Sequence, residues 1–189
     1  MSHGLMTFAR RIGRRAKRLL RREEGTATME FVIMFPVFMT LFLSSFELAI
    51  LMTRQAFLER AVDMTVRDLR LGTWPNLDAD LLKSEICSHL GTLISNCSSE
   101  LMLELTPVNR ASWSLPNPAA TCVNRGADVQ PVVTFTAGTQ NEMMIVRACA
   151  MVDPVFPGTA LALLLEENVG DGFPLIATSG FVNEPGTGT

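Results

Sequence analysis

The longest apolar stretch of the chain runs from Phe31 to Thr53 and contains a single charged residue, Glu47. As a helix it would span ~34 Å, slightly more than the roughly 30 Å of hydrocarbon in a bilayer. A soluble core helix rarely stays apolar on every face over this length, so the pattern predicts a transmembrane helix. Pro36 lies inside the run and leaves the Val32 carbonyl without its helical partner, so we expect a kink or a local loosening there.

The helical pattern continues beyond the apolar run, but with apolar residues on one face only. It contains no Gly or Pro until Gly72 and Pro75 end it. The apolar stripe consists of Leu51, Leu58, Ala61, Val62, Thr65 and Leu69. We therefore predict one helix of ~40 residues, with residues 26–53 in lipid and residues 54–72 as an amphipathic extension. A sheet would cover the stripe; a coiled-coil partner is the alternative, although about two heptads are short for one.

Residues 73–189 combine helical and strand patterns. A helix is predicted from Asp78, a good N-cap residue, to about Ile94, and a short helix over Ala160–Glu167. The strand patterns cover Leu101–Thr106, Val129–Ala137, Glu142–Val152 and Leu175–Val182. The second and third of these would form a hairpin around Gly138–Asn141. The predicted fold class is α+β, with the long N-terminal helix packed on a small antiparallel sheet.

The net charge of −3 conceals a strong asymmetry along the chain. Residues 1–25 carry eight Lys or Arg and two Glu, whereas the remaining residues carry eight basic and seventeen acidic side chains. A basic segment can bind nucleic acid, but directly before an apolar helix it indicates a cytoplasmic flank next to anionic lipid. We therefore predict a basic cytoplasmic leader over residues 1–25 and a periplasmic domain over residues 73–189. The expected partner is the lipid bilayer and not nucleic acid.

A cleaved secretory signal is the main alternative to a transmembrane helix. The apolar core of such a signal normally has ~7–15 residues and ends in an A-x-A-like site. The apolar run of this chain is longer, and no small-x-small site follows it before Gln55. The sequence therefore favours a retained membrane anchor.

All four cysteines follow the predicted transmembrane helix, and an even number in an exported domain is typical of two disulfides. Of the three possible pairings, Cys87–Cys97 is favoured because it would tie the end of a helix to the following loop. Cys122–Cys149 would then pin the long loop predicted over Pro107–Asp128 to the third predicted strand. Metal binding by Cys87, His89 and Cys97 is the alternative, but structural zinc sites usually contain C-x₂₋₄-C pairs, which this sequence lacks.

The sequence contains no recognisable catalytic signature. G-x-S-x-G, H-E-x-x-H, phosphate-loop and dinucleotide-binding motifs are all absent from it. The predicted exported part has one histidine, His89, on a predicted helix where a surface or capping role is more common than catalysis. We therefore expect no enzymatic activity, no catalytic residue, no cofactor and no metal.

Glu30 lies at the cytoplasmic edge of the apolar run, where a carboxylate that enters lipid needs a partner. It follows a basic leader, Gly25 and four neutral residues, and this string resembles the processing signal of type IV prepilins and pseudopilins. The resemblance implies that a prepilin peptidase cuts between Gly25 and Thr26 on the cytoplasmic side. Glu30 would become the fifth residue of the mature chain and neutralise the N-terminal ammonium of a neighbouring subunit. The alternative is an interfacial carboxylate that snorkels to the headgroups.

A longer segment extends the resemblance. Glu30–Val37 reads EFVIMFPV and is similar to the opening of TadE-like proteins, the minor pseudopilins of the tight-adherence (Flp) pilus system. Ile145–Cys149 and Phe173–Pro185 are similar as well. The major Flp pilin usually carries Glu-Tyr and almost no exported domain. Here the pair is Glu-Phe and more than a hundred residues follow the helix, which points to a minor component.

The resemblance implies a pilin-like fold and a structural function. The chain would take part in assembly or initiation of a tight-adherence pilus as a single-pass protein of the bacterial inner membrane. Its partners would be the prepilin peptidase, other pilins and pseudopilins, and the pilus assembly machinery of the inner membrane. The resemblance is also compatible with incorporation of the chain into the pilus as a subunit. An unprocessed, membrane-anchored periplasmic scaffold or secretion accessory protein is the alternative.

Overall fold

The computed structural model describes residues 26–74, 76–113, 115, 117, 120–159 and 172–184. The chain divides into two compact units, Met1–Leu43 and Ser44–Thr189. The basic leader over residues 1–25 and the short helix predicted over Ala160–Glu167 lie outside the described residues.

A single helix, α2, runs from Thr26 to Arg70 and continues through Pro36. It ends where Gly72 takes a positive φ of 66°, a conformation that costs glycine little, and the Gly72 N–H bonds the Leu69 carbonyl at 3.0 Å. The apolar stripe predicted on the second half of α2 is buried, with Leu58, Ala61, Val62 and Thr65 at 1% exposure or less. The prediction of one long helix with a buried stripe on its C-terminal half is therefore confirmed.

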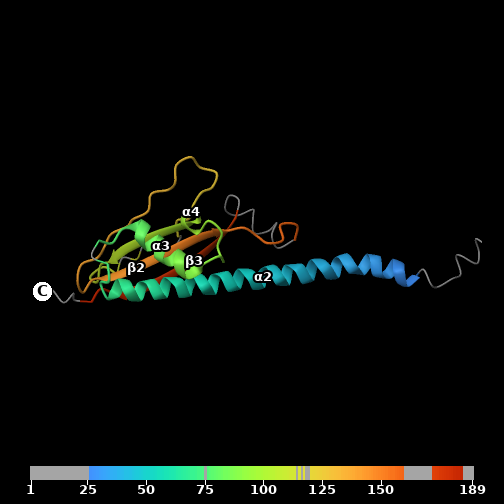
Figure 1. The fold of residues 1–189 in the computed structure, drawn as a ribbon, viewed down its shortest axis with the longest axis horizontal. Coiled ribbons are helices and arrows are strands. Elements are labelled where there is room, and N and C mark those ends of the chain that lie inside the picture. Colours follow the sequence, from blue (N-terminus) through green and yellow to red (C-terminus); the bar gives the residue numbers. More distant parts are fainter. Residues whose placement is uncertain are drawn as a thin grey trace, which may run out of the picture. The chain divides into compact units, whose positions relative to one another are not determined.

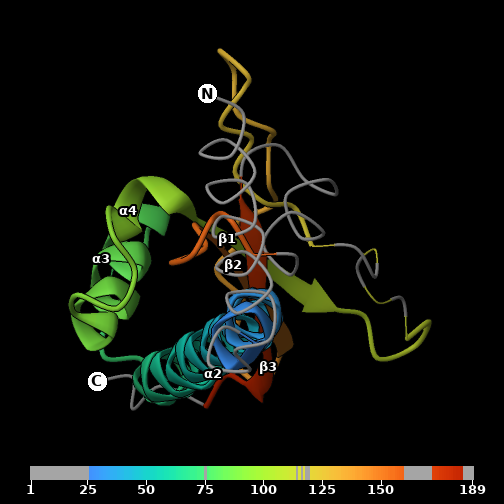
Figure 2. The ribbon, with the colours of Figure 1, turned by 90° about the vertical axis from the view of Figure 1, so that its right-hand side faces the viewer.

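Three antiparallel strands form the sheet that covers this stripe. They are β1 (Leu101–Val108), β2 (Met143–Val152) and β3 (Phe173–Val182), in the order β1-β2-β3. Ala148 of β2 is opposite Leu103 of β1 and Ala177 of β3. Figure 1 shows the strands beside the C-terminal half of α2, and Figure 2 looks along that helix.

The core lies between the sheet and α2 because alternate strand residues point to that side. The strand residues in this core are Leu101, Leu103, Leu105, Met144, Val146, Ala148, Ala150, Val152, Leu175, Ala177 and Phe181. A smaller cluster of Met102, Val123 and Met151 occupies the opposite face of the sheet. The structure thus confirms the predicted α+β class, with the helix packed on a small antiparallel sheet.

The predicted second helix is α3 (Ala79–Leu90), and it is shorter than expected. Asp78 caps it, with its carboxylate accepting the Leu81 N–H at 2.6 Å. It ends at Leu90 rather than near Ile94, because Gly91 turns the chain with a φ of 57°. Ile94 still reaches the core from the following turn, before the four-residue helix α4 (Cys97–Glu100).

The predicted strand Val129–Ala137 and its hairpin are wrong. The structure has no such strand, and Val132, near the middle of the segment, is 97% exposed. Pro131 has no N–H to give to a ladder. Instead, Phe135 forms one parallel bridge with Leu105, so the segment lies against the free edge of β1 and not beside β2.

Candidate functional site

The two sequence-predicted residues of the processing and assembly signal that the structure describes both lie on α2. Thr26 is the first residue of α2, and Glu30 follows one turn later with an exposed side chain. Glu30 makes no hydrogen bond or ion pair with any other described residue. Gly25, the residue before the predicted cut, lies outside the described part of the chain. A carboxylate exposed at the edge of an apolar helix is available to a cation from another molecule.

The apolar half of α2 presents its side chains outward. Among the described residues this is the one helix long and apolar enough to cross a membrane. Its large exposed side chains before Ser44 are Met29, Phe31, Val32, Ile33, Met34, Phe35, Val37, Phe38, Leu41 and Phe42. Exposure of so many large apolar side chains is unfavourable in water and is satisfied by lipid or by other apolar helices.

Glu47, the single charge of the apolar run, has a function that the sequence pattern did not reveal. Its side chain is completely buried. One carboxylate oxygen accepts the Val155 N–H at 2.9 Å, and the other accepts the Phe156 N–H at 2.8 Å. The carboxylate therefore joins α2 to the segment that follows β2. The only signal in the sequence was the presence of a lone carboxylate in an apolar run, which does not identify its partner.

A polar network continues this attachment further along α2. The Arg54 guanidinium donates to the Asp153 carbonyl at 2.9 Å, and the Gln55 amide donates to the Ile176 carbonyl at 2.8 Å. The Asp153 carboxylate in turn pairs with Arg125. The second half of α2 is thus held to β3 and to the residue after β2 by directional bonds as well as by the apolar core.

Arg125 lies between two carboxylates at this end of the sheet. It pairs with Asp153 and, at 2.9 Å, with Glu100 at the end of α4. Burial alone would lower the pKa of Arg125, but the hydrogen bonds and charges of Asp153 and Glu100 outweigh it and raise that pKa above the ordinary arginine value. The guanidinium stays charged and links the loop around residue 125 to two other elements.

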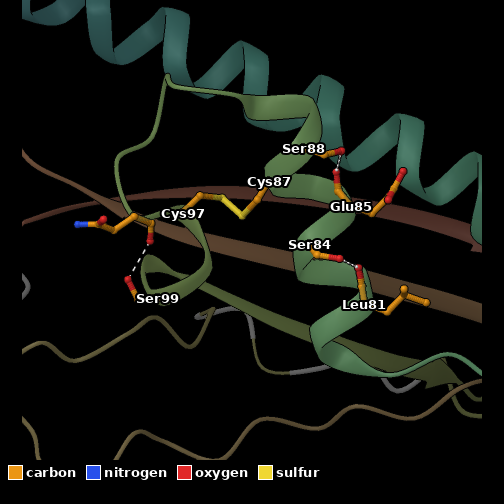
Figure 3. The surroundings of a disulfide bond; sticks show 8 residues. Leu81, Ser84, Glu85, Cys87, Ser88, Cys97 and Ser99 are labelled. Atoms are coloured by element: carbon orange, nitrogen blue, oxygen red, sulfur yellow. Dashed lines mark hydrogen bonds between the residues drawn. A yellow bond between two sulfur atoms is a disulfide. The ribbon is translucent and has the colours of Figure 1, made fainter.

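The two disulfides have the pairings that the sequence favours. Cys87 of α3 is bonded to Cys97 of α4 with Cα atoms 5.8 Å apart, and Figure 3 shows this bond with its surroundings. Cys122 is bonded to Cys149 of β2 with Cα atoms 5.2 Å apart. The described cysteines are all paired, so Cys87 and Cys97 present no thiolate to a metal beside His89.

The face of the sheet that points away from α2 carries a second attachment for the long loop. Arg147 of β2 lies opposite Glu104 of β1, with 3.5 Å between the guanidinium and the carboxylate. The same guanidinium donates to the Asn117 carbonyl at 2.6 Å. Together with the Cys122–Cys149 disulfide, these contacts fix a long segment that has little secondary structure of its own.

The described residues hold two disulfides, ion pairs between elements and a helix clamped at Glu47, and they contain no group of three or more potential metal-ligating side chains. No curated protein and no solved structure matches the chain. A family model described as TadE-like protein does match residues 25–67, so the resemblance to TadE-like proteins is confirmed for this N-terminal segment.

Proposed function

We propose that this chain is a minor pseudopilin of a tight-adherence pilus, made as a precursor and cut by a prepilin peptidase between Gly25 and Thr26. The observation that carries the proposal is the TadE-like match, which begins at Gly25 and extends along α2 to residue 67. It contains the proposed cleavage junction and Glu30. The proposed role is structural and not catalytic.

The surroundings of Glu30 support the assembly step. Its side chain is exposed and pairs with no other described residue, while the apolar side chains that follow it on α2 are exposed as well. Cleavage would place a new ammonium on Thr26. In a bundle of such helices, the Glu30 carboxylate of one subunit would pair with the Thr26 ammonium of its neighbour, where low dielectric strengthens the attraction.

The proposed location is the bacterial inner membrane, with the N-terminus in the cytoplasm and the sheet-bearing unit in the periplasm. The excess of Lys and Arg before α2 supports this orientation. The two disulfides support it independently, because such bonds persist in an oxidising compartment such as the periplasm. The proposed partners are the prepilin peptidase, other pilins and pseudopilins, and the assembly machinery of the inner membrane.

Co-expression with the cognate prepilin peptidase tests the processing step. The chain should lose 25 residues, and Gly25→Ala should slow or block the loss because a Cβ at this position obstructs the extended backbone in the peptidase cleft. Gly13→Ala is the matched control, since it makes the same change within the leader and should leave cleavage intact. If the wild-type chain keeps Met1 while the major pilin is cut in the same cells, the alternative of an unprocessed periplasmic scaffold replaces this proposal.

A further inference from the structure

We infer that the loop Pro154–Gly158 is a second membrane contact, whose apolar side chains enter the outer lipid interface and whose depth is fixed by Glu47. The inference rests on the membrane span of α2 proposed above. It does not depend on cleavage or on the pilus, and its experiment reports on the span separately.

The position of Glu47 along the apolar run gives its depth. Glu47 is the seventeenth residue of the run that begins at Phe31. At 1.5 Å per residue, it lies ~24 Å along a hydrocarbon core of roughly 30 Å. Glu47 is therefore just inside the outer edge of the apolar layer, where an unpartnered carboxylate is costly.

The contacts of Glu47 bring the loop to the same depth. The carboxylate is fully buried, and its two oxygens accept the backbone N–H groups of Val155 and Phe156 at 2.9 and 2.8 Å. Both donors must lie within a few ångströms of the carboxylate. If Glu47 is near the outer edge of the hydrocarbon, this part of the loop is there too.

The side chains that the loop presents are apolar. Residues 154–158 read PVFPG and carry no charge. Val155 is 43% exposed, Phe156 and Pro154 are half-buried, and Pro157 is exposed. These side chains carry no charge, and the exposed Val155 and Pro157 suit the acyl side of a lipid interface better than water.

Besides Glu47, the charged groups that the described residues place next to this loop are Asp153, which directly precedes it, and the two arginines that bind Asp153. Arg54 lies seven residues beyond Glu47, which is ~10 Å along the helix. Its guanidinium bonds the Asp153 carbonyl, and Arg125 pairs with the Asp153 carboxylate. Along α2 the loop is therefore attached within the apolar run, at Glu47, and Arg54 follows it, which is the order expected from the edge of the hydrocarbon toward the headgroups.

A groove that begins directly after Glu47 on α2 adds further apolar surface. Its lining is apolar at Leu48, Leu51, Met52, Phe173 and Pro174 and polar at Gln55 and Glu59, and Leu48 and Met52 are 45% and 63% exposed. These residues come directly after Glu47 on α2 and from the start of β3. The apolar surface at the membrane end of this unit thus extends beyond one loop.

Depth-dependent quenching of tryptophan fluorescence tests the inference on the full chain. A background with Trp74→Phe and Trp113→Phe carries one new probe, Val155→Trp, in vesicles of phosphatidylglycerol and brominated phosphatidylcholine. Bromines near the headgroup end of the acyl chains should quench this probe strongly, and its emission should shift to the blue. Val132→Trp, at a position that is 97% exposed on another loop, should show neither effect.

Two further probes keep the outcomes distinct. Phe38→Trp lies within the apolar run and should be quenched most by bromines deep in the acyl chains; if it is not quenched, the span of α2 itself is wrong. Pro157→Trp repeats the loop measurement at a second exposed position, so that a local disturbance at residue 155 does not decide the result. Quenching of Phe38→Trp with no quenching of either loop probe overturns the inference and leaves the loop as a surface for a protein partner.

Discussion

Two glutamates on α2 have opposite surroundings, and each makes a prediction at the scale of the residue. Glu30 is exposed and pairs with no described residue, whereas Glu47 is fully buried and accepts two backbone N–H groups. The first is available to a partner outside the chain. The second is used within it.

Glu30→Gln should leave membrane insertion and cleavage largely intact but abolish pilus formation. A neutral side chain cannot compensate the Thr26 ammonium of a neighbouring subunit, and leaving a buried charge unpaired costs ~3–5 kcal/mol, more than a hundredfold in association. Counting pili by electron microscopy and measuring cleavage by mass would check this. Glu24→Gln, on the other side of the cut, is the control and should be silent. Normal piliation of the Glu30→Gln strain would make Glu30 a simple interfacial residue.

Glu47→Ala should free the loop after β2. The substitution removes both acceptors of the Val155 and Phe156 N–H groups, so we expect a loss of ~2–4 kcal/mol in the free energy of unfolding. Hydrogen exchange of these two amides, measured in micelles, should accelerate strongly. Glu59→Ala changes an exposed glutamate on the same helix and should cost little. Unchanged protection of both amides in Glu47→Ala would show that other contacts hold the loop.

At the scale of the element, the ends of α3 show what the sequence could and could not predict. Asp78 was predicted as the N-cap because a carboxylate there can accept an orphan N–H, and the bond to Leu81 confirms it. The spacing of apolar residues predicts that this helix ends near Ile94. The same spacing fits a helix that ends earlier, followed by a turn that brings Ile94 back to the core. The conformation of Gly91 ended the helix four residues earlier.

The contribution of the Asp78 cap to stability can be measured with a single substitution. Asp78→Ala should lower the free energy of unfolding by ~1 kcal/mol, because the Leu81 N–H loses its acceptor. Asp80→Ala is the control, since Asp80 is an exposed carboxylate in the first turn of α3 that caps no N–H. Denaturant unfolding monitored by circular dichroism separates the two variants. Equal losses in both would contradict the assignment of the cap.

The two disulfides connect elements over different lengths of chain, and their removal should differ accordingly. Replacing Cys87 and Cys97 by Ser opens a loop with a sequence separation of 10, and replacing Cys122 and Cys149 opens one of 27. Chain-entropy arguments give losses of ~2.7 and ~3.6 kcal/mol, so the second pair should matter more. Thermal unfolding of the two double variants checks the order. Four free thiols in the wild-type chain, detected by mass mapping in freshly isolated membranes, would contradict both bonds.

At the scale of the whole molecule, local sequence patterns predict where helices and strands lie better than they predict which elements contact one another. The stripe on α2 identified a buried face because helical spacing fixes which residues share a side. The alternation of apolar residues in Val129–Ala137 predicted a strand that the structure does not have. Alternation does not show which strand of the sheet has an unpaired edge, and Pro131 cannot donate a hydrogen bond to a neighbouring strand. The partners of Glu47 lie 108 and 109 residues away, a distance over which no local pattern carries information.

The orientation of the molecule makes a prediction at this scale. A phosphatase fused after Leu71, just beyond α2, should be active because it reaches the periplasm, and a fusion after Gly25 should be inactive. The expectation rests on the excess of Lys and Arg before α2, which favours a cytoplasmic N-terminus. Fluorescent-protein fusions at the same two positions give the reverse pattern and serve as the control. Phosphatase activity at Gly25 but not at Leu71 would invert the proposed topology.

The N-terminal sequence of the chain isolated from its native membrane tests the central claim most directly. Processing as a pseudopilin predicts a mature chain that begins at Thr26, with Glu30 as its fifth residue. A chain that still begins at Met1 in cells where the major pilin is cleaved would contradict the account and leave an unprocessed anchored protein in its place.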